Sequence, residues 1–279
     1  MAELLTWVFD RYSPRGRESS LSLSPPEGEA RSLSCILLGG RGCGKTCLLF
    51  LTAVMAASEL GRKVIFLSPT PIQTLPAPLM EARAGLDPAS LKKIKFVYPR
   101  TAEELLRDVA CLHEAAGAPP SLLIVDGLEC YLRWGGEGEQ AHQMAARLSA
   151  LLCDTSTFLS RARAGAPGDP PAECQLIVSL DTHPERGAEA SGSDSVLSVF
   201  ERYFPVRCTL GRDASCAGTR ACRIYFSGFQ QTEGRDSGLG RHWELVYTPS
   251  GAMEFTPIPE KSQAGKVSDP YGSKRTLTV

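Results

Sequence analysis

The chain has 279 residues, of which 43% are hydrophobic and 22% are charged, an ordinary composition for a soluble globular protein. That length allows one α/β domain with a large core, or two small domains. The net charge of −1 excludes a protein-wide basic field, so nucleic-acid binding would require a local basic patch.

The sequence argues against a membrane-spanning protein, a secreted protein, and a fold held together by zinc or disulfides. No run approaches 18 apolar residues, and the start, MAELLTWVFDRY, carries Glu3 and Asp10 in place of a long apolar signal. The ten cysteines are scattered and form no C-x-x-C pair, which argues against a zinc site or a disulfide framework. We expect reduced, mostly buried thiols in a protein of the cytosol or nucleus.

The two ends differ in composition from the middle. Residues 13–32 are rich in Ser, Pro and charge, which predicts a flexible N-terminal segment over 1–32. Four side chains near the start could nevertheless line one side of a short helix: Leu4, Leu5, Val8 and Tyr12. We expect a single domain over 33–258, followed by a polar tail over 259–279.

Between these ends, apolar strands alternate with helical patterns. Five strands are predicted, at 33–38, 63–68, 94–98, 121–127 and 174–180. Three helices are predicted, at 46–60, 101–117 and 140–165. The last third reads as strands joined by turns, at 203–210, 219–228 and 241–258. This order predicts an α/β fold with a mostly parallel sheet and antiparallel C-terminal strands.

The first strand runs into a glycine-rich loop, residues 37–46, LLGGRGCGKT. It matches the Walker A pattern, in which backbone N–H groups and a helix N-terminus surround the phosphates of a nucleotide. Lys45 is expected to bridge the β- and γ-phosphates of ATP, and the Thr46 hydroxyl to bind Mg²⁺. The predicted nucleotide-binding residues are Gly39, Gly40, Arg41, Gly42, Cys43, Gly44, Lys45 and Thr46.

A second motif lies further along the chain. Residues 122–126, LLIVD, form an apolar strand that ends in a carboxylate, as in the Walker B motif. Asp126 is therefore expected to hold Mg²⁺ together with Thr46. The alternative is a buried strand whose terminal Asp merely caps the next segment.

The motif pair and the residues around it resemble a known family. The stretch 86–132 and the segments GKTCLLF, VIFLSPTPIQTLP, LLCDT and RYFP are similar to the SWIM-zinc-finger-associated ATPases of the Shu complex, which are divergent RecA/recombinase paralogues. The resemblance spans about residues 33–257 and implies a RecA-like P-loop NTPase core.

The resemblance also implies a function. It implies support of homologous recombination in DNA repair in the nucleus, with a SWIM-domain zinc-finger protein as partner. It further implies binding of single-stranded DNA and cooperation with the strand-exchange recombinase and its paralogues.

The sequence departs from the RecA pattern at one catalytic position. In RecA-type enzymes the strand after the P-loop helix ends in a glutamate that activates the attacking water. Here Ser68, Thr70 or Pro71 stands at that place, and no Asp or Glu occurs from 63 through 80. A hydroxyl is not a general base on its own. We therefore expect ATP binding with slow hydrolysis at most.

The remaining candidates follow the fifth strand and two loops. We predict Lys45, Asp126 and Asp181 as catalytic groups, with Asp181 orienting water at the end of the fifth strand. A carboxylate there would repel a γ-phosphate unless Mg²⁺ lay between them, and a solvated strand end is the alternative.

By resemblance, DNA would contact the loops after the fourth and fifth strands, 127–140 and 182–195. Arg133, Trp134 and Arg186 could neutralise phosphates and stack on bases there. The alternative is that these are ordinary surface residues of loops.

Two other functions remain open. A non-hydrolysing P-loop scaffold for protein assembly is compatible with the missing glutamate. A small-molecule kinase would share the P-loop, but C-terminal strands that extend the sheet favour the recombinase class.

Overall fold

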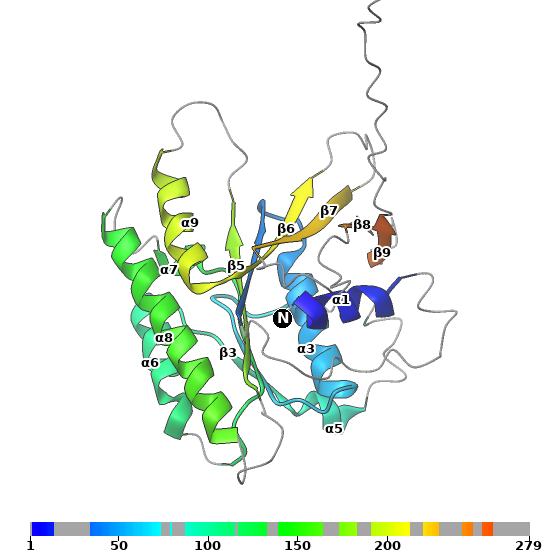
Figure 1. Ribbon diagram of the computed structural model, residues 1–279. Helices are drawn as coiled ribbons and strands as arrows, with labels where there is room; N and C mark the ends of the chain where they lie inside the picture. Colours follow the sequence, from blue (N-terminus) through cyan, green and yellow to red (C-terminus); the bar gives the residue numbers. More distant parts are fainter. Residues whose placement is uncertain are drawn as a thin grey trace, which may run out of the picture.

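The structure of the chain is a computed structural model that describes residues 2–13, 34–73, 79, 87–114, 117–132, 139–163, 173–182, 191–212, 220–228, 242–247 and 253–258. These residues build a nine-stranded sheet with helices on both of its faces (Figure 1).

The strand order of the sheet is β3-β2-β4-β5-β1-β6-β7-β8-β9. Neighbouring strands are parallel from β3 to β6 and antiparallel from β6 to β9. The bounds are β1 Ser34–Gly39, β2 Val64–Leu67, β3 Ile94–Val97, β4 Leu122–Val125, β5 Gln175–Asp181, β6 Val206–Arg212, β7 Arg220–Ser227, β8 His242–Tyr247 and β9 Met253–Ile258. This confirms the predicted α/β fold with antiparallel C-terminal strands.

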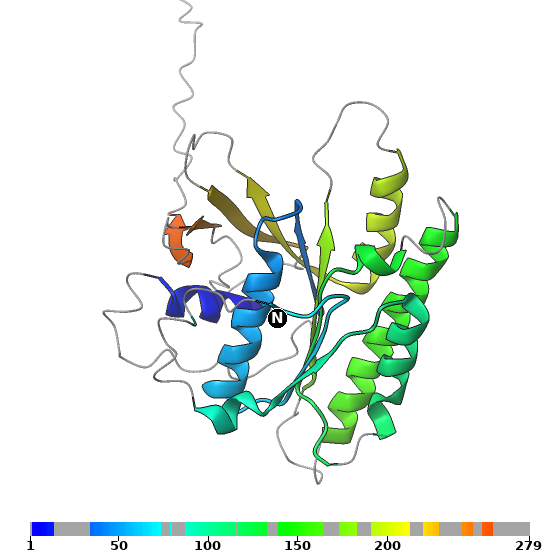
Figure 2. The same ribbon diagram turned by 180° about the vertical axis from the view of Figure 1, so that it is seen from behind.

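Helices cover the two faces of the sheet unequally. The helices α6, α7, α8 and α9 lie on one face, while α1, α3 and α5 lie on the other, as the two opposite views show (Figures 1 and 2). The bounds are α1 Ala2–Arg11, α3 Lys45–Ser58, α5 Pro88–Leu91, α6 Ala102–Ala110, α7 Glu129–Leu132, α8 Glu139–Arg163 and α9 Ser191–Tyr203, with the 3₁₀-helix η2 at Cys111–Glu114.

The central strands are buried on both faces, which explains their unbroken apolar sequences. Successive side chains of a strand point to opposite faces. In β1, Cys35 and Leu37 therefore join the core cluster around α3, while Ile36 and Leu38 join the cluster around α6 and α8. The sheet is thus fixed from both sides, and its strand ends provide a rigid base for side chains that follow them.

The N-terminal segment begins with structure rather than with flexible chain. Helix α1 buries Leu4, Leu5 and Val8, as their spacing suggested, together with Phe9. The Phe9 ring stacks on Phe255 of β9 at 4.9 Å between centroids. The predicted boundary at residue 33 therefore leaves out a helix that is part of the core, whereas residues 14–33 are outside the described part of the chain.

A second difference concerns the loop predicted at 182–195. Helix α9 begins at Ser191, within that range, and its C-terminal half packs Phe200 into the core. Val196, Leu197 and Val199 lie against the same core cluster. The spacing of these apolar residues is the sequence signal for this helix, and they lie between the predicted loop 182–195 and the predicted strand 203–210, where no element was predicted.

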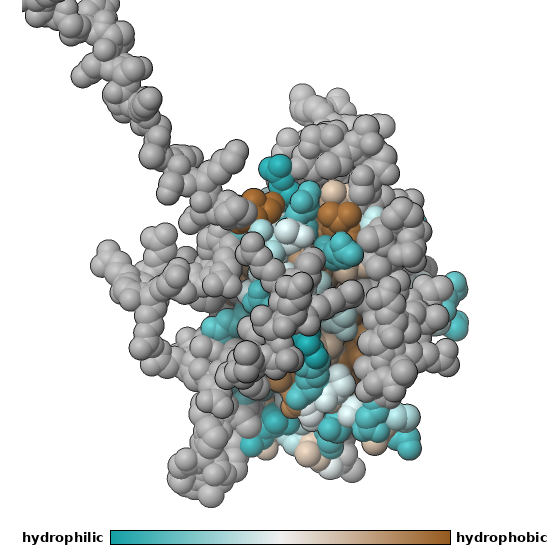
Figure 3. Space-filling view, turned by 90° about the vertical axis from the view of Figure 1, so that its right-hand side faces the viewer, coloured by the Kyte–Doolittle hydropathy of each residue, from teal (hydrophilic) through white to brown (hydrophobic). Residues whose placement is uncertain are grey.

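Three features of the helices, cysteines and surface complete the description. Within the described ranges, no helix is long and apolar enough to cross a membrane. Five of the nine cysteines in those ranges are buried, and burial raises the pKa of the Cys35 thiol to about 12. On the side of the molecule that carries α1 and α5, the hydrophobic residues that show in colour lie in separate areas among hydrophilic ones (Figure 3).

Candidate phosphate-binding site

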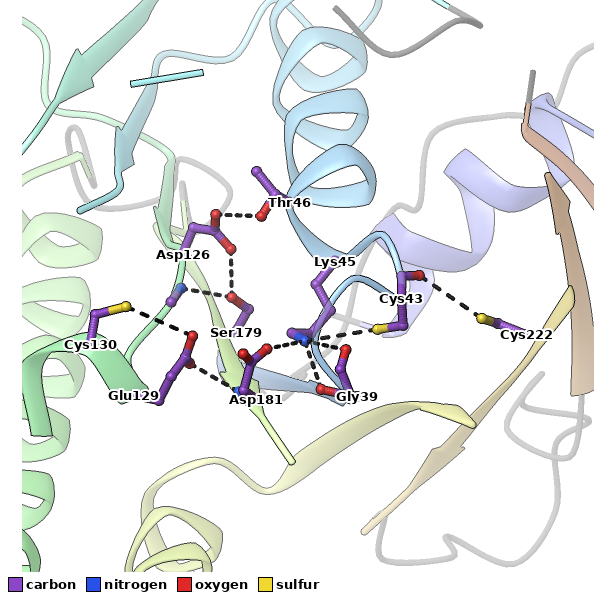
Figure 4. Close-up of polar contacts among 12 residues, drawn as sticks. Gly39, Cys43, Lys45, Thr46, Asp126, Glu129, Cys130, Ser179, Asp181 and Cys222 are labelled. Carbon is purple, nitrogen blue, oxygen red and sulfur yellow. Dashed lines mark hydrogen bonds and ion pairs between the residues drawn. The ribbon is translucent and has the colours of Figure 1, made fainter. Parts of the chain in front are cut away.

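The residues of both sequence motifs meet at the carboxyl ends of β1, β4 and β5 (Figure 4). The loop after β1 leads into α3, Asp126 follows β4, and Asp181 ends β5. Strand β1 pairs with β5 so that Gly39 lies opposite Asp181. In an open parallel sheet, this edge is the usual place for a bound ligand.

The loop between β1 and α3 has the conformation that its glycines allow. Gly42 and Gly44 have φ values of 73° and 93°, in the left-handed region that favours glycine. Arg41 and Gly42 are exposed, whereas Cys43 is buried. Helix α3 begins after Gly44 without a side-chain cap, so its first backbone N–H groups remain available to an anion.

Lys45 is the cation at the centre of this loop. Its ammonium group donates to the carbonyl oxygens of Gly39 and Gly40 at 2.6 and 3.2 Å. It also forms an ion pair with Asp181, with 2.6 Å between Nζ and Oδ1, and only 7% of the lysine side chain is exposed. The lysine is therefore held in place, and a carboxylate is its counter-ion in this structure.

Thr46 and Asp126 form the second half of the site. The Thr46 hydroxyl donates to Asp126 Oδ2 at 2.7 Å, and Thr46 is exposed. The Ser179 hydroxyl donates to the other oxygen, Asp126 Oδ1, at 2.6 Å. Ser179 also accepts the backbone N–H of Gly127 at 2.9 Å, so one buried serine fixes both the carboxylate and the chain that follows it.

This donor set fits a magnesium ion. Mg²⁺ in proteins takes oxygen ligands, commonly one or two carboxylates together with substrate phosphates. A hydroxyl and a carboxylate whose oxygens already lie 2.7 Å apart, beside an open helix N-terminus, provide such ligands without rearrangement of the backbone. Thr46 and Asp126 are thus the residues that would hold the ion.

Glu129, which the sequence analysis did not single out, belongs to the same edge. It is the first residue of α7, and its Oε2 accepts the backbone N–H of Asp181 at 2.9 Å. Burial raises the pKa of the Glu129 carboxyl, and the nearby Asp181 charge adds to this, while Lys45 lowers it. The signal in the sequence is a carboxylate three residues after Asp126, and the structure shows that it begins a short helix.

The raised pKa has a consequence for stability. The folded state prefers the protonated Glu129, so the stability that this carboxyl provides is lost as pH rises from the unfolded-state value of 4.5 through the folded pKa. We therefore expect the unfolding free energy of Glu129→Gln, measured in urea, to increase relative to that of the wild type as the pH is raised from 4.5 to 8. An equal difference at both pH values would contradict the assigned burial effect.

The end of β2 lacks the carboxylate that RecA-type enzymes use. Ser68 is buried, and its hydroxyl donates to the carbonyl of Thr70 at 2.9 Å. Thr70 and Pro71 line a pocket of about 400 Å³ with Thr46, Cys47, Phe50, Ile72 and Gln73. The side chains that follow β2 in the described part of this segment are thus hydroxyl, amide and apolar groups.

The antiparallel strands contact the loop from the other side. The Tyr247 hydroxyl at the end of β8 donates to the carbonyl of Cys43 at 3.1 Å. A Cβ atom on Gly44 would lie 1.5 Å from this Tyr247 oxygen. The C-terminal sheet extension thus helps to hold the phosphate loop in its conformation.

The predicted DNA-contacting residues cannot be placed. Arg133, Trp134 and Arg186 lie outside the residues that the structure describes, between α7 and α8 and after β5. Their role remains a prediction. Of the two predicted loops, the structure describes only the first residues, 127–132 after Asp126 and 182 after Asp181.

Ser179→Ala should destabilise the fold. The substitution leaves one Asp126 oxygen and the Gly127 N–H without their partner, which costs about 1–3 kcal/mol of unfolding free energy. Urea denaturation measures this cost. Ser58→Ala is the matched control, because that hydroxyl only adds a bond to the Val54 carbonyl within α3. Equal effects of the two changes would refute the role of Ser179.

Comparison with known proteins shows the family to which the chain belongs. It is 39% identical over 240 residues to human ATPase SWSAP1, covering 85% of this chain and 94% of that protein. It is 36% identical over 259 residues to mouse ATPase SWSAP1, covering 91% and 85%. Among solved structures it is similar to the RadB recombinase, with a TM-score of 0.54, 15% identity and coverage of 81% and 92%, which shows a RecA-like fold. No protein-family model matches the chain.

Proposed function

The chain belongs to the family of the SWSAP1 ATPases, and we propose that it binds ATP with magnesium in the loop around Lys45 and acts as a recombinase-paralogue subunit in DNA repair. The single observation that carries the ATP part is the arrangement of Lys45, Thr46 and Asp126. An ammonium, a hydroxyl and a carboxylate meet there at the open N-terminus of α3.

The chemistry of each residue follows from its position. The backbone N–H groups at the start of α3 and the Lys45 ammonium would bind the β- and γ-phosphates. The ion pair with Asp181 keeps the Lys45 side chain oriented in this structure. On binding of ATP, the γ-phosphate would replace Asp181 as the counter-ion of Lys45. When bound, magnesium would supply charge neutralisation of the phosphates, with Thr46 and Asp126 as its protein ligands.

The nucleoside has a candidate place as well. The pocket of about 400 Å³ opens beside Thr46, and its lining combines apolar Phe50, Pro71 and Ile72 with polar Thr70 and Gln73. Small-molecule pockets have volumes of about 300–1,000 Å³ and mix apolar walls with a few polar groups. We place the base and ribose of ATP in this pocket.

The recombination part of the proposal rests on the family. We propose a SWIM-domain zinc-finger protein as partner, the strand-exchange recombinase and its paralogues as the machinery that it supports, and the nucleus as its compartment. Single-stranded DNA would bind through the segments after β4 and β5, which contain Arg133, Trp134 and Arg186.

The DNA part is tested by the binding of a fluorescent single-stranded oligonucleotide to the full chain with its SWIM-domain partner. Contacts to phosphates predict an affinity that falls steeply with added salt, because counterions are released on binding. Ala substitutions of Arg133 and Arg186 should each flatten this dependence. Absence of binding at low salt would remove DNA from the proposal.

A non-hydrolysing scaffold is the second candidate, and one observation favours it. No carboxylate follows β2 within the described residues 64–73, so the usual water-activating acid is missing there. A scaffold would assemble with its partner and support repair even after Lys45→Ala. An ATP-dependent subunit would lose at least one of these functions.

A further inference from the structure

We infer that Glu129 is the general base for ATP hydrolysis, in place of the glutamate that is missing at the end of β2. This inference rests on the proposed binding of ATP at Lys45 and deepens it. It is carried by the position of one carboxylate relative to the loop, to Asp181 and to Asp126 (Figure 4).

Glu129 is held at the reacting end of the site from two directions. Helix α7 starts three residues after Asp126, so the backbone fixes Glu129 at the end of β4. The backbone N–H of Asp181 holds its Oε2 at 2.9 Å, and the side chain of the same Asp181 contacts Lys45 at 2.6 Å. Asp181 thus connects the Glu129 carboxylate to the Lys45 ammonium that would bind the γ-phosphate.

The two other carboxylates of this edge are engaged in other contacts. Asp126 accepts hydroxyl hydrogen bonds on both oxygens, from Thr46 and Ser179, and is the candidate metal ligand. Asp181 is the ion-pair partner of Lys45. Glu129 uses Oε2 to accept the Asp181 N–H, whereas its Oε1 lies 4.0 Å from the weak thiol donor of Cys130. Oε1 is therefore the carboxylate oxygen best able to accept a proton from water.

The environment of Glu129 suits this role. Partial burial raises the pKa of its carboxyl, which makes the carboxylate a stronger base than an exposed one. Carboxyls with perturbed pKa values are common at catalytic sites. Glu129 is only partly buried, so water can reach it.

A water oxygen forms a bond to the γ-phosphorus of ATP, and the bond between that phosphorus and the β,γ-bridging oxygen breaks. The electron pair of the broken bond stays on the bridging oxygen of ADP. One proton of the water passes to Glu129 Oε1 and returns to solvent after phosphate leaves.

The test compares binding and turnover by the full chain. Glu129→Gln keeps an amide oxygen that can accept the Asp181 N–H, but it cannot take up a proton. Its kcat for ATP hydrolysis should fall at least about 100-fold, whereas its ATP affinity should change less than about 3-fold. Glu129→Asp, which keeps a shorter carboxylate, should retain part of the rate. Glu114→Gln, at a carboxylate with 69% of its side chain exposed, is the matched control and should leave both quantities unchanged.

The outcomes separate this inference from the proposed function. ATP binding by the wild type with full turnover by Glu129→Gln would overturn the role of Glu129 alone. The same holds for a wild type that binds ATP but does not hydrolyse it, with or without single-stranded DNA. Failure of the wild type to bind ATP would instead overturn the proposed function.

Discussion

Lys45→Ala is expected to lower the affinity of the chain for ATP by about 100-fold or more, equivalent to roughly 3 kcal/mol. The Lys45 side chain is almost fully buried in the loop. Hydrogen bonds to two carbonyl oxygens and an ion pair with one carboxylate orient its ammonium group. Alanine removes the cation that would face the β- and γ-phosphates. It also leaves the negative charge of Asp181 uncompensated at the site, where it would repel the nucleotide.

Competition with a fluorescent ATP analogue measures this effect. Lys63→Ala is the matched control, because Lys63 is exposed and lies before β2, at the opposite end of the sheet. Its affinity for ATP should equal that of the wild type. If Lys45→Ala bound ATP as tightly as Lys63→Ala, the loop would not be the phosphate site.

Gly44→Ala should destabilise the protein by roughly 3 kcal/mol or more and abolish ATP binding with it. Gly44 has a φ of +93°, which L-residues rarely adopt, and its added Cβ would lie 1.5 Å from the Tyr247 hydroxyl oxygen. Either the Tyr247 side chain must turn out of its hydrogen bond to the Cys43 carbonyl, or the start of α3 must move, and both contacts fix the phosphate loop. Urea denaturation measures the loss of unfolding free energy.

Two further variants separate the causes of that loss. Gly40→Ala, whose Cβ would meet its nearest atom, the Thr182 carbonyl oxygen, at an ordinary 3.8 Å, should cost less than about 1 kcal/mol. In a Tyr247→Ala background the clash disappears but the backbone strain remains, so the cost of Gly44→Ala should shrink without vanishing. A Gly44→Ala variant as stable as Gly40→Ala would contradict the described contact.

The sequence predicted Lys45, Thr46, Asp126 and Asp181 as site residues, but not the contacts that depend on strand order. Lys45 and Thr46 follow the short loop after β1, and Asp126 follows β4, so the local sequence around each motif is enough to predict these positions. The Lys45–Asp181 ion pair instead requires β5 to be the neighbour of β1, which no residue pattern encodes. Glu129 was missed for the same reason, since its hydrogen bond comes from β5.

The fold was predicted more completely than the site, and helix α1 is an informative exception. Strands buried on both faces and the C-terminal hairpins have unmistakable patterns, and each was placed within a few residues. Helix α1 is short and is followed by a stretch rich in Ser and Pro, so its neighbours suggested flexibility although Phe9 packs on Phe255. Isolated helices of this length are marginal, and tertiary packing stabilises them.

Calorimetric titration of the folded full chain with ATP and magnesium tests the central claim most directly. We predict saturable binding of one ATP per chain that weakens when magnesium is chelated, since Thr46 and Asp126 then lose the ion that they would share with the phosphates. Absence of any binding heat up to millimolar ATP, from a chain that unfolds cooperatively, would contradict it.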